Sequence, residues 1–146
     1  MTTLTEHRQV PFDRRQIFDL VADVERYPAF LPRILASRIR HREGNIVRVD
    51  MLLGFGIWRR RIASVGTLAP PAHIDIVSHD APFARFALHW RFEPTPNGGT
   101  NVSLTADFAF RARLWERFLA PYLRSEMQAM VDAFERRANV ICVARS

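Results

Sequence analysis

The sequence contains no lysine and a single cysteine, and each shortage excludes a kind of chemistry. All 21 basic residues are arginine, so no lysine Schiff base can form. Cys142 alone supports neither an intrachain disulfide nor a thiolate metal cluster. Arginine binds phosphate through paired hydrogen bonds. The net charge of +6 therefore indicates either a phosphate-bearing partner, such as anionic lipid or RNA, or a solvated surface with a coding preference for arginine.

Long apolar runs are also missing, since no stretch approaches the roughly 18 residues that cross a bilayer. The first residues, MTTLTEHRQV, are polar and resemble neither a signal peptide nor a transit peptide. The composition, 48% hydrophobic and 25% charged, is typical of a globular protein. We therefore expect a single domain over residues 1–146, located in the cytoplasm, with a peripheral position at the inner face of the membrane as a further option.

Motifs for metal binding and catalysis are lacking as well. The histidines show neither HxxxH nor HExxH spacing, and there is no GxSxG, P-loop or GxGxxG sequence. The five histidines are His7, His41, His73, His79 and His89. Gly54 and Gly56 form a lone GxG that indicates a turn. We expect no metal, no cofactor and no enzymatic activity, and ligand binding that needs neither Cys142 nor a histidine; His89 should point away from the core.

The N-terminal part predicts a strand followed by two helical segments. Residues 3–10 alternate weakly and fit an edge strand. Asp13 and Gln16 have the spacing of a capping box, so a helix is expected over residues 14–24. A second, very short helical turn is expected over residues 27–31, entered at Pro28 and ended before Pro32.

Residues 34–110 predict about six further strands, which with the first give a seven-stranded antiparallel sheet. Two stretches alternate most clearly between apolar and polar positions, at 86–92 and 102–110. A long helix follows, in which Pro121 should cause a kink or a restart. Its apolar positions, spaced by three to five residues, are Leu114, Phe118, Leu123, Met127, Met130, Phe134 and Ala138. The order of elements indicates an α+β protein in which one long helix covers one face of a curved sheet.

A curved sheet cannot close fully onto a single helix, so we expect a gap between them that holds an apolar ligand. Its expected lining is Phe86, Trp90, Phe92 and Phe108 from the sheet with Met127 and Met130 from the helix. Arg60 shares strand parity with Trp58 and Ile62, so it could point inward to meet a quinone carbonyl or a lipid phosphate; the alternative is that Arg59 and Arg61 do so.

Four separated blocks resemble the coenzyme Q-binding family of START-like, helix-grip proteins, which overlaps with the ribosome-association toxin family and the polyketide cyclase-like group. The blocks are DLVADVERYPAFLP, DAPFARFALHWRF, ADFAFRARL and MVDAFERRA, and the match extends over residues 9–138. The resemblance implies a seven-stranded sheet gripped around the C-terminal helix, a hydrophobic tunnel, and ubiquinone or a similar lipid as ligand in support of respiration. Arg33, Ile34 and Gly56 depart from residues common in that family.

Pattern and resemblance together give thirteen candidate ligand-binding residues: Tyr27, Phe30, Leu31, Phe55, Trp58, Arg60, Phe83, Phe86, Trp90, Phe92, Phe108, Met127 and Met130. The leading hypothesis is a non-catalytic chaperone or carrier of ubiquinone or a related lipid. One alternative is a factor or toxin that binds the large ribosomal subunit, and a weaker one is a polyketide cyclase-like enzyme. DNA is not expected as a partner.

The stretch YPAFLP raises a separate question, because prolines hold an apolar turn in a fixed conformation. In one interpretation, Tyr27, Phe30 and Leu31 form an apolar lip that controls ligand uptake, with Arg26 and Arg33 meeting lipid phosphates. In the other, Phe30 and Leu31 close the core beneath the turn. The resemblance supports the lip, because it places this turn at the mouth of the tunnel, and both interpretations stay open.

Overall fold

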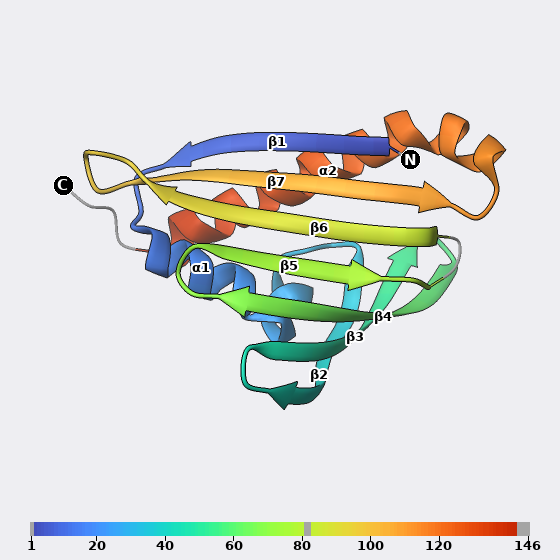
Figure 1. Ribbon diagram of the computed structural model, residues 1–146, viewed down its shortest axis with the longest axis horizontal. Helices are drawn as coiled ribbons and strands as arrows, with labels where there is room; N and C mark the ends of the chain where they lie inside the picture. The colour runs from blue at the N-terminus through green and yellow to red at the C-terminus, as the bar shows by residue number, and fades with distance from the viewer. Residues whose placement is uncertain (1, 81–82, 143–146) are drawn as a thin grey trace.

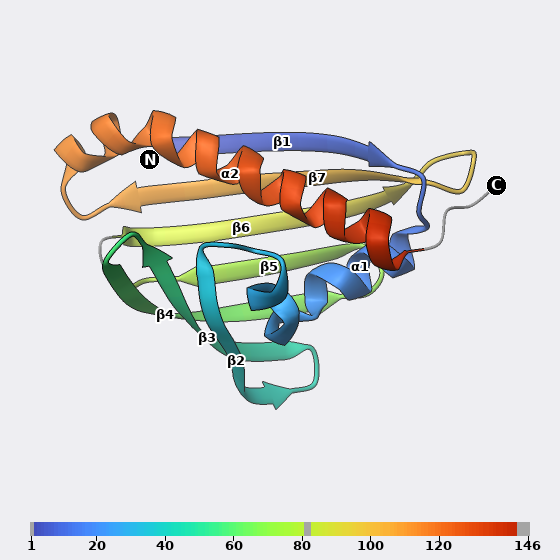
Figure 2. The same cartoon turned by 180° about the vertical axis from the view of Figure 1, so that it is seen from behind.

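The computed structural model describes residues 2–80 and 83–142, without the side chains at positions 55, 58 and 115. One antiparallel sheet of seven strands curves around a long C-terminal helix (Figures 1 and 2). In chain order the elements are β1 (Thr2–Val10), α1 (Arg14–Ala22), the 3-10 helix η1 (Val24–Ala29), β2 (Ile34–Glu43), β3 (Ile46–Phe55), β4 (Trp58–Ala69), β5 (His73–Ser78), β6 (Phe83–Pro94), β7 (Thr100–Phe110) and α2 (Arg113–Ile141). The strands lie in the order β1-β7-β6-β5-β4-β3-β2. The predicted fold class is confirmed.

The alternation in β6 and β7 separates the two faces of the sheet as predicted. Ile74, Trp90 and Leu104 are direct neighbours across β5, β6 and β7, and all three are buried on the face that α2 covers. The adjacent row, Asp75 and His89, lies on the opposite face. Because side chains alternate along a strand, the first row lies on an apolar face and the adjacent row presents polar side chains on the other.

The N-cap hydrogen bond of the predicted capping box is present at the start of α1. The Asp13 carboxylate accepts a hydrogen bond from the backbone N–H of Gln16 at 3.0 Å. The expected boundaries after it were wrong, since α1 ends at Ala22 and η1 already begins at Val24. The Arg26 N–H donates to the Asp23 carbonyl at 3.1 Å, so the chain tightens immediately after α1 and Pro28 lies inside the turn rather than at its start.

Pro121 does not restart α2, which is continuous over its whole length. The helix nevertheless bends after its first turns (Figure 2), as expected where proline removes one backbone N–H. The expected single apolar row along α2 was wrong at its beginning, where Leu114 and Phe118 are 66% and 69% exposed. Phe118 and Leu123 are five residues apart, so their side chains point about 140° apart around the helix axis and do not share a face.

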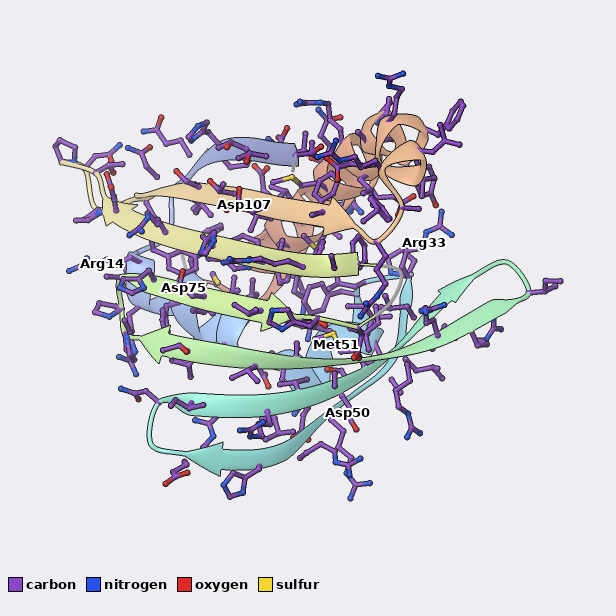
Figure 3. All side chains as sticks on the ribbon, turned by 45° about the vertical axis from the view of Figure 1, so that its right-hand side comes forward. Arg14, Arg33, Asp50, Met51, Asp75 and Asp107 are labelled. Atoms are coloured by element: carbon purple, nitrogen blue, oxygen red, sulfur yellow. The ribbon has the colours of Figure 1, made fainter. Side chains whose placement is uncertain are left out.

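Helix α2 lies mainly over β1 and β7, whereas α1 packs on β5 and β6 and η1 packs on β2. The turn between β3 and β4 projects from the body of the molecule (Figure 3). No helix in the described part of the chain combines the length and the hydropathy that crossing a bilayer requires.

Candidate functional site

An aromatic cluster, here called the closed cluster, joins the C-terminal half of α2 to the YPAFLP turn. It consists of Tyr27, Phe30, Trp90 and Phe134. The Phe134 ring makes edge contacts with the other three, at centroid distances of 5.3, 5.3 and 5.1 Å respectively. The Arg137 guanidinium lies 5.4 Å from the centre of the Phe30 ring. Phe30 therefore packs against two side chains of α2, Phe134 and Arg137.

The lip interpretation of the YPAFLP turn is not the arrangement observed. Tyr27 and Leu31 are only 5% and 4% exposed, so they face the core and not the solvent. The Tyr27 hydroxyl donates to the carbonyl of Val21, one of the last carbonyls of α1 and hence without a partner inside that helix. Burial raises the pKa of the Tyr27 phenol, which keeps this proton in place. Arg33 is also engaged, since it binds Glu126 of α2 through two contacts of 3.2 Å.

A second aromatic cluster, here called the open cluster, lies where β6 begins and β7 ends. It consists of Phe83, Phe86, Phe108 and Phe110, with ring centroids 4.9 Å apart for Phe83–Phe86, 4.8 Å for Phe83–Phe110 and 5.8 Å for Phe108–Phe110. Phe108 and Phe110 are buried, but Phe83 and Phe86 remain half-buried.

Further apolar side chains at the margin of the core are also only half-buried. Together with Phe83 and Phe86 they form what we call the half-buried apolar surface: Met51, Ile76, Phe83, Phe86, Leu88, Leu123 and Met130. It contains strand residues of the helix-covered face and two residues of α2. The chain therefore leaves apolar area partly accessible on this side of the sheet.

The thirteen predicted residues divide into four groups. Buried are Tyr27, Leu31, Trp90, Phe92, Phe108 and Met127, and half-buried are Phe30, Phe83, Phe86 and Met130. The side chains of Phe55 and Trp58 lie outside the described residues. The inward position considered for Arg60 was wrong. Arg60 pairs with Leu53 and so lies on the expected face of the sheet, but its side chain is exposed. The β3–β4 segment runs beyond the covering helices there (Figure 3), so Arg60 reaches solvent instead of a cavity.

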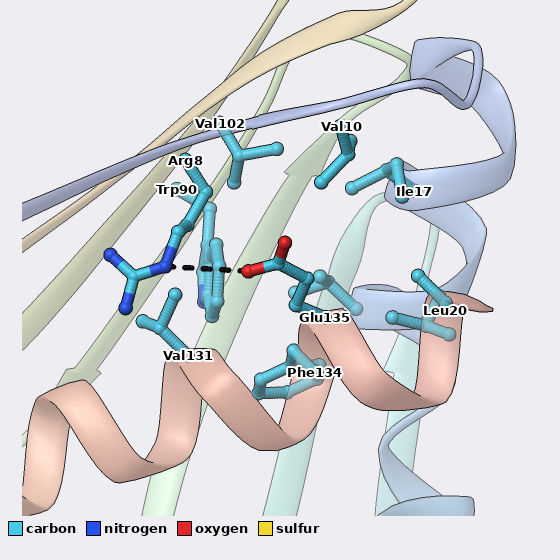
Figure 4. A pocket seen from close by; sticks show the side chains of 11 residues that line it. Arg8, Val10, Ile17, Leu20, Trp90, Val102, Val131, Phe134 and Glu135 are labelled. Atoms are coloured by element: carbon cyan, nitrogen blue, oxygen red, sulfur yellow. Dashed lines mark ion pairs between the residues drawn. The ribbon is translucent and has the colours of Figure 1, made fainter.

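A small apolar cavity lies at the closed end, between α1, β1 and the C-terminal half of α2 (Figure 4). Its volume is about 30 Å³. That holds little more than one water molecule, whereas pockets for drug-sized ligands have several hundred Å³. Trp90 and Phe134 line it, and the ion pair between Arg8 and Glu135 spans it. A quinone ring would not fit there unless α2 moved.

Arg8 is a residue that sequence reasoning missed. It binds Glu6 at 2.6 Å on its own strand, and Asp132 at 2.8 Å and Glu135 at 3.4 Å on α2. The hydrogen bonds to Asp132 and Glu6 raise the pKa of the guanidinium. Arg8 thereby fastens the last turns of α2 to the β1 edge of the sheet. No local pattern signals this, because Arg8 and Asp132 are 124 positions apart.

The polar face of the sheet carries a chain of titratable groups (Figure 3). Asp75 lies 3.1 Å from a ring nitrogen of His73 and 2.7 Å from one of His89, whose other nitrogen is 3.4 Å from Asp107. Partial burial alone would raise the pKa of Asp75, but the hydrogen bonds to His89 and His73 outweigh it and lower that pKa. His89 thus points away from the core as predicted. Within the described residues no group of histidine, cysteine or carboxylate side chains is arranged to hold a metal ion.

One buried polar atom on the helix-covered side has no partner among the described residues, the hydroxyl oxygen of Ser37. Ser37 lies opposite Met51 in the β2–β3 register, and Met51 belongs to the half-buried apolar surface. A buried hydroxyl without a hydrogen bond is costly. It is therefore a group to which a ligand oxygen could bind. Sequence reasoning did not single it out, since one serine in a strand carries no signal.

The comparisons with known proteins show the family and the fold of the chain. The model for polyketide cyclase / dehydrase and lipid transport proteins matches residues 10–135. The chain is 30% identical to the ribosome association toxin RatA of Pseudomonas aeruginosa over 130 residues, which are 89% of this chain and 90% of that protein. It is 26% identical to the mitochondrial coenzyme Q-binding protein COQ10 homolog B of Xenopus laevis, over 94% of this chain and 58% of that one. The Zhui aromatase/cyclase from Streptomyces sp. R1128 superposes with a TM-score of 0.85 at 16% identity, over 94% and 93% of the two chains.

Proposed function

We propose that this chain, which belongs to the polyketide cyclase / dehydrase and lipid transport family, is a non-catalytic protein that binds ubiquinone or a related lipid and acts as its chaperone or carrier in respiration. The observation that carries the proposal is the half-buried apolar surface, in particular Phe83 and Phe86. Complete burial of one such side chain is worth roughly 1.5–3 kcal/mol. An apolar ligand beneath α2 would supply the missing cover.

Ser37 supports a ligand that carries a polar head group. Its buried hydroxyl lacks a hydrogen-bond partner in the described part of the chain, and satisfying such a group is worth about 1–3 kcal/mol. A quinone carbonyl accepts a hydrogen bond but donates none, which matches a hydroxyl donor. The similarity to a protein named for coenzyme Q binding supports the same ligand class.

The test begins with the ligand that the protein carries. The purified protein is extracted with organic solvent, and the extract is analysed by mass spectrometry; a quinone or another prenyl lipid is the expected result. Binding of a short-tail ubiquinone is then measured for Phe86→Ala and Ser37→Ala. Both should weaken binding, whereas Ile46→Ala, which removes an exposed apolar side chain on β3, should not. An empty protein that fails to bind any prenyl lipid would refute the proposal.

A second candidate is an association with the ribosome. It is favoured by the 30% identity to a ribosome association toxin over most of both chains and by a basic surface made only of arginine. Sedimentation of the protein with isolated ribosomal subunits, over a range of salt concentrations, tests it. Binding to the large subunit that weakens as salt is raised would favour this function.

A cyclase-like activity has weaker support. The similarity to an aromatase/cyclase is a similarity of fold alone. The chain of titratable groups around Asp75 lies on the face of the sheet opposite to α2. It cannot act on a substrate held beneath the helix.

A further inference from the structure

The first turns of α2 present a row of large apolar side chains to solvent. The row consists of Leu114, Phe118 and Tyr122, which are 66%, 69% and 44% exposed; we call it the exposed row. A spacing of four residues places all three on one face of the helix. Single exposed apolar residues are common on protein surfaces, but a contiguous row of them marks an interaction site.

Arginines lie along one flank of the exposed row. At 100° per residue, Arg113, Arg117 and Arg124 fall on the same side of the helix, next to the row. All three are exposed, and within the described residues none of them forms an ion pair. The flank is therefore a line of exposed positive side chains.

The two carboxylates in these turns are directed elsewhere. Glu116 accepts hydrogen bonds from the Thr2 hydroxyl at 2.7 Å and from the Phe110 N–H at 3.2 Å. Glu126 binds Arg33 at 3.2 Å and lies near the Tyr122 hydroxyl at the end of the row. Both carboxylates therefore bind partners outside the arginine flank, although Glu116 itself lies beside Arg113 and Arg117.

A further exposed apolar residue, outside the exposed row, lies at the same end of the molecule. Ile57, at the tip of the β3–β4 turn, is 93% exposed, and Arg59, Arg60 and Arg61 follow it. The turn and the first turns of α2 project from the end of the molecule at which β6 begins (Figures 1 and 3). That is also the end that holds the open cluster.

We propose that the exposed row docks this end of the protein onto an anionic lipid bilayer. The rings and the leucine would enter the boundary between head groups and acyl chains, while the flanking arginines meet lipid phosphates, as in interfacial amphipathic helices. A second copy of the chain is a poor occupant, because two such arginine flanks repel each other. RNA would use the arginines but leave the apolar row exposed to water. This contact surface is separate from the YPAFLP turn, and it does not depend on the identity of the ligand.

The test measures binding of the full chain to vesicles of phosphatidylcholine, with and without phosphatidylglycerol, by co-sedimentation. Anionic vesicles should bind the protein, less so at high salt, and neutral vesicles should bind it weakly. The double substitution Leu114→Ser with Phe118→Ser should reduce binding to anionic vesicles by roughly tenfold or more, from the apolar area lost. Arg117→Gln should reduce it about fivefold, at roughly 1 kcal/mol per arginine near the surface.

Matched controls lie at the other end of the same helix. Val140→Ser removes a side chain that is 76% exposed, and Arg136→Gln removes an exposed charge; both should leave vesicle binding unchanged. Equal binding to neutral and anionic vesicles, or an unchanged double variant, would overturn the proposal. So would binding to RNA without binding to vesicles. Mass spectrometry of the extracted ligand is independent of all these outcomes, so the docking surface and the ligand proposal can fail separately.

Discussion

The closed cluster and the open cluster are built from the same kinds of side chain, but the chain covers them to different degrees. Around Phe134, rings from η1, β6 and α2 contact one another and leave only a cavity of about 30 Å³ nearby. Around Phe86, the rings pack on the sheet, and two of the four remain half-buried. Aromatic content therefore does not identify a ligand site. What distinguishes the two ends is whether helices of the same chain complete the packing.

The largest expected effect distinguishes the two clusters by stability. Phe134→Ala should lower the free energy of unfolding by roughly 3–5 kcal/mol, because it leaves a cavity in contact with three other rings. Phe86→Ala should cost clearly less, about 1–2 kcal/mol, since its side chain is already half-exposed. Urea denaturation of both variants gives the two values. Equal losses would mean that the open cluster is as much a part of the core as the closed one.

The next effect concerns how the closed end is fastened. Arg8→Gln should lower the free energy of unfolding by about 1–2 kcal/mol, because Asp132 and Glu135 lose their shared partner on β1. Arg15→Gln is the matched control, since its pair with Asp19 is exposed and should contribute less than about 0.5 kcal/mol. The same denaturation experiment compares them. An Arg8 variant as stable as the control would show that packing alone holds α2 in place.

A smaller effect is expected within the YPAFLP turn. Tyr27→Phe removes the hydroxyl that binds the Val21 carbonyl while keeping the ring in the closed cluster, and it should cost about 1 kcal/mol. Uptake of a short-tail quinone by the folded variant should stay as in the wild type. Reduced uptake with full stability would mean that this turn acts on the ligand after all.

The smallest effect belongs to the polar face, which neither cluster touches. The folded state lowers the pKa of Asp75 below its ordinary value of 3.8. Its stabilising contribution is therefore complete above about pH 4 and is lost as the pH falls through the lower, folded value. Asp75→Asn should be slightly less stable than the wild type at neutral pH, and the difference should shrink below about pH 3.8. A difference that persists at low pH would point to packing and not to charge.

Most of the fold could be predicted from local chemistry. Asp13 and Gln16 signalled the start of α1, and alternation assigned the faces of β6 and β7 correctly. The family resemblance is confirmed by the match over residues 10–135. These features depend on neighbouring residues, or on several blocks in a fixed order, and both are visible in a sequence.

The site was harder to predict, because it depends on where covering elements stop. Periodicity assigned Phe118 and Phe134 to the same helix, but it could not tell that the first is exposed and the second buried. Strand parity assigned Arg60 to the expected face, but it could not show that the strand runs beyond the helices at that point. The partners of Arg8 lie on a distant element, and the buried hydroxyl of Ser37 has no sequence signature. Each of these depends on tertiary contacts far along the chain.

The fastening of α2 by Arg8 and Phe134 has a consequence for how such sequences can diverge. Arg8 and Phe134 lie at the closed end, whereas the open cluster and the exposed row lie away from both, near a separate attachment that Glu116 makes to Thr2 and Phe110. Substitutions at the open end that spare Glu116 can therefore alter the surface there without weakening the attachments that maintain the fold. A single architecture could then be inherited by proteins of different specificity, in keeping with a TM-score of 0.85 to a protein that shares 16% of its residues.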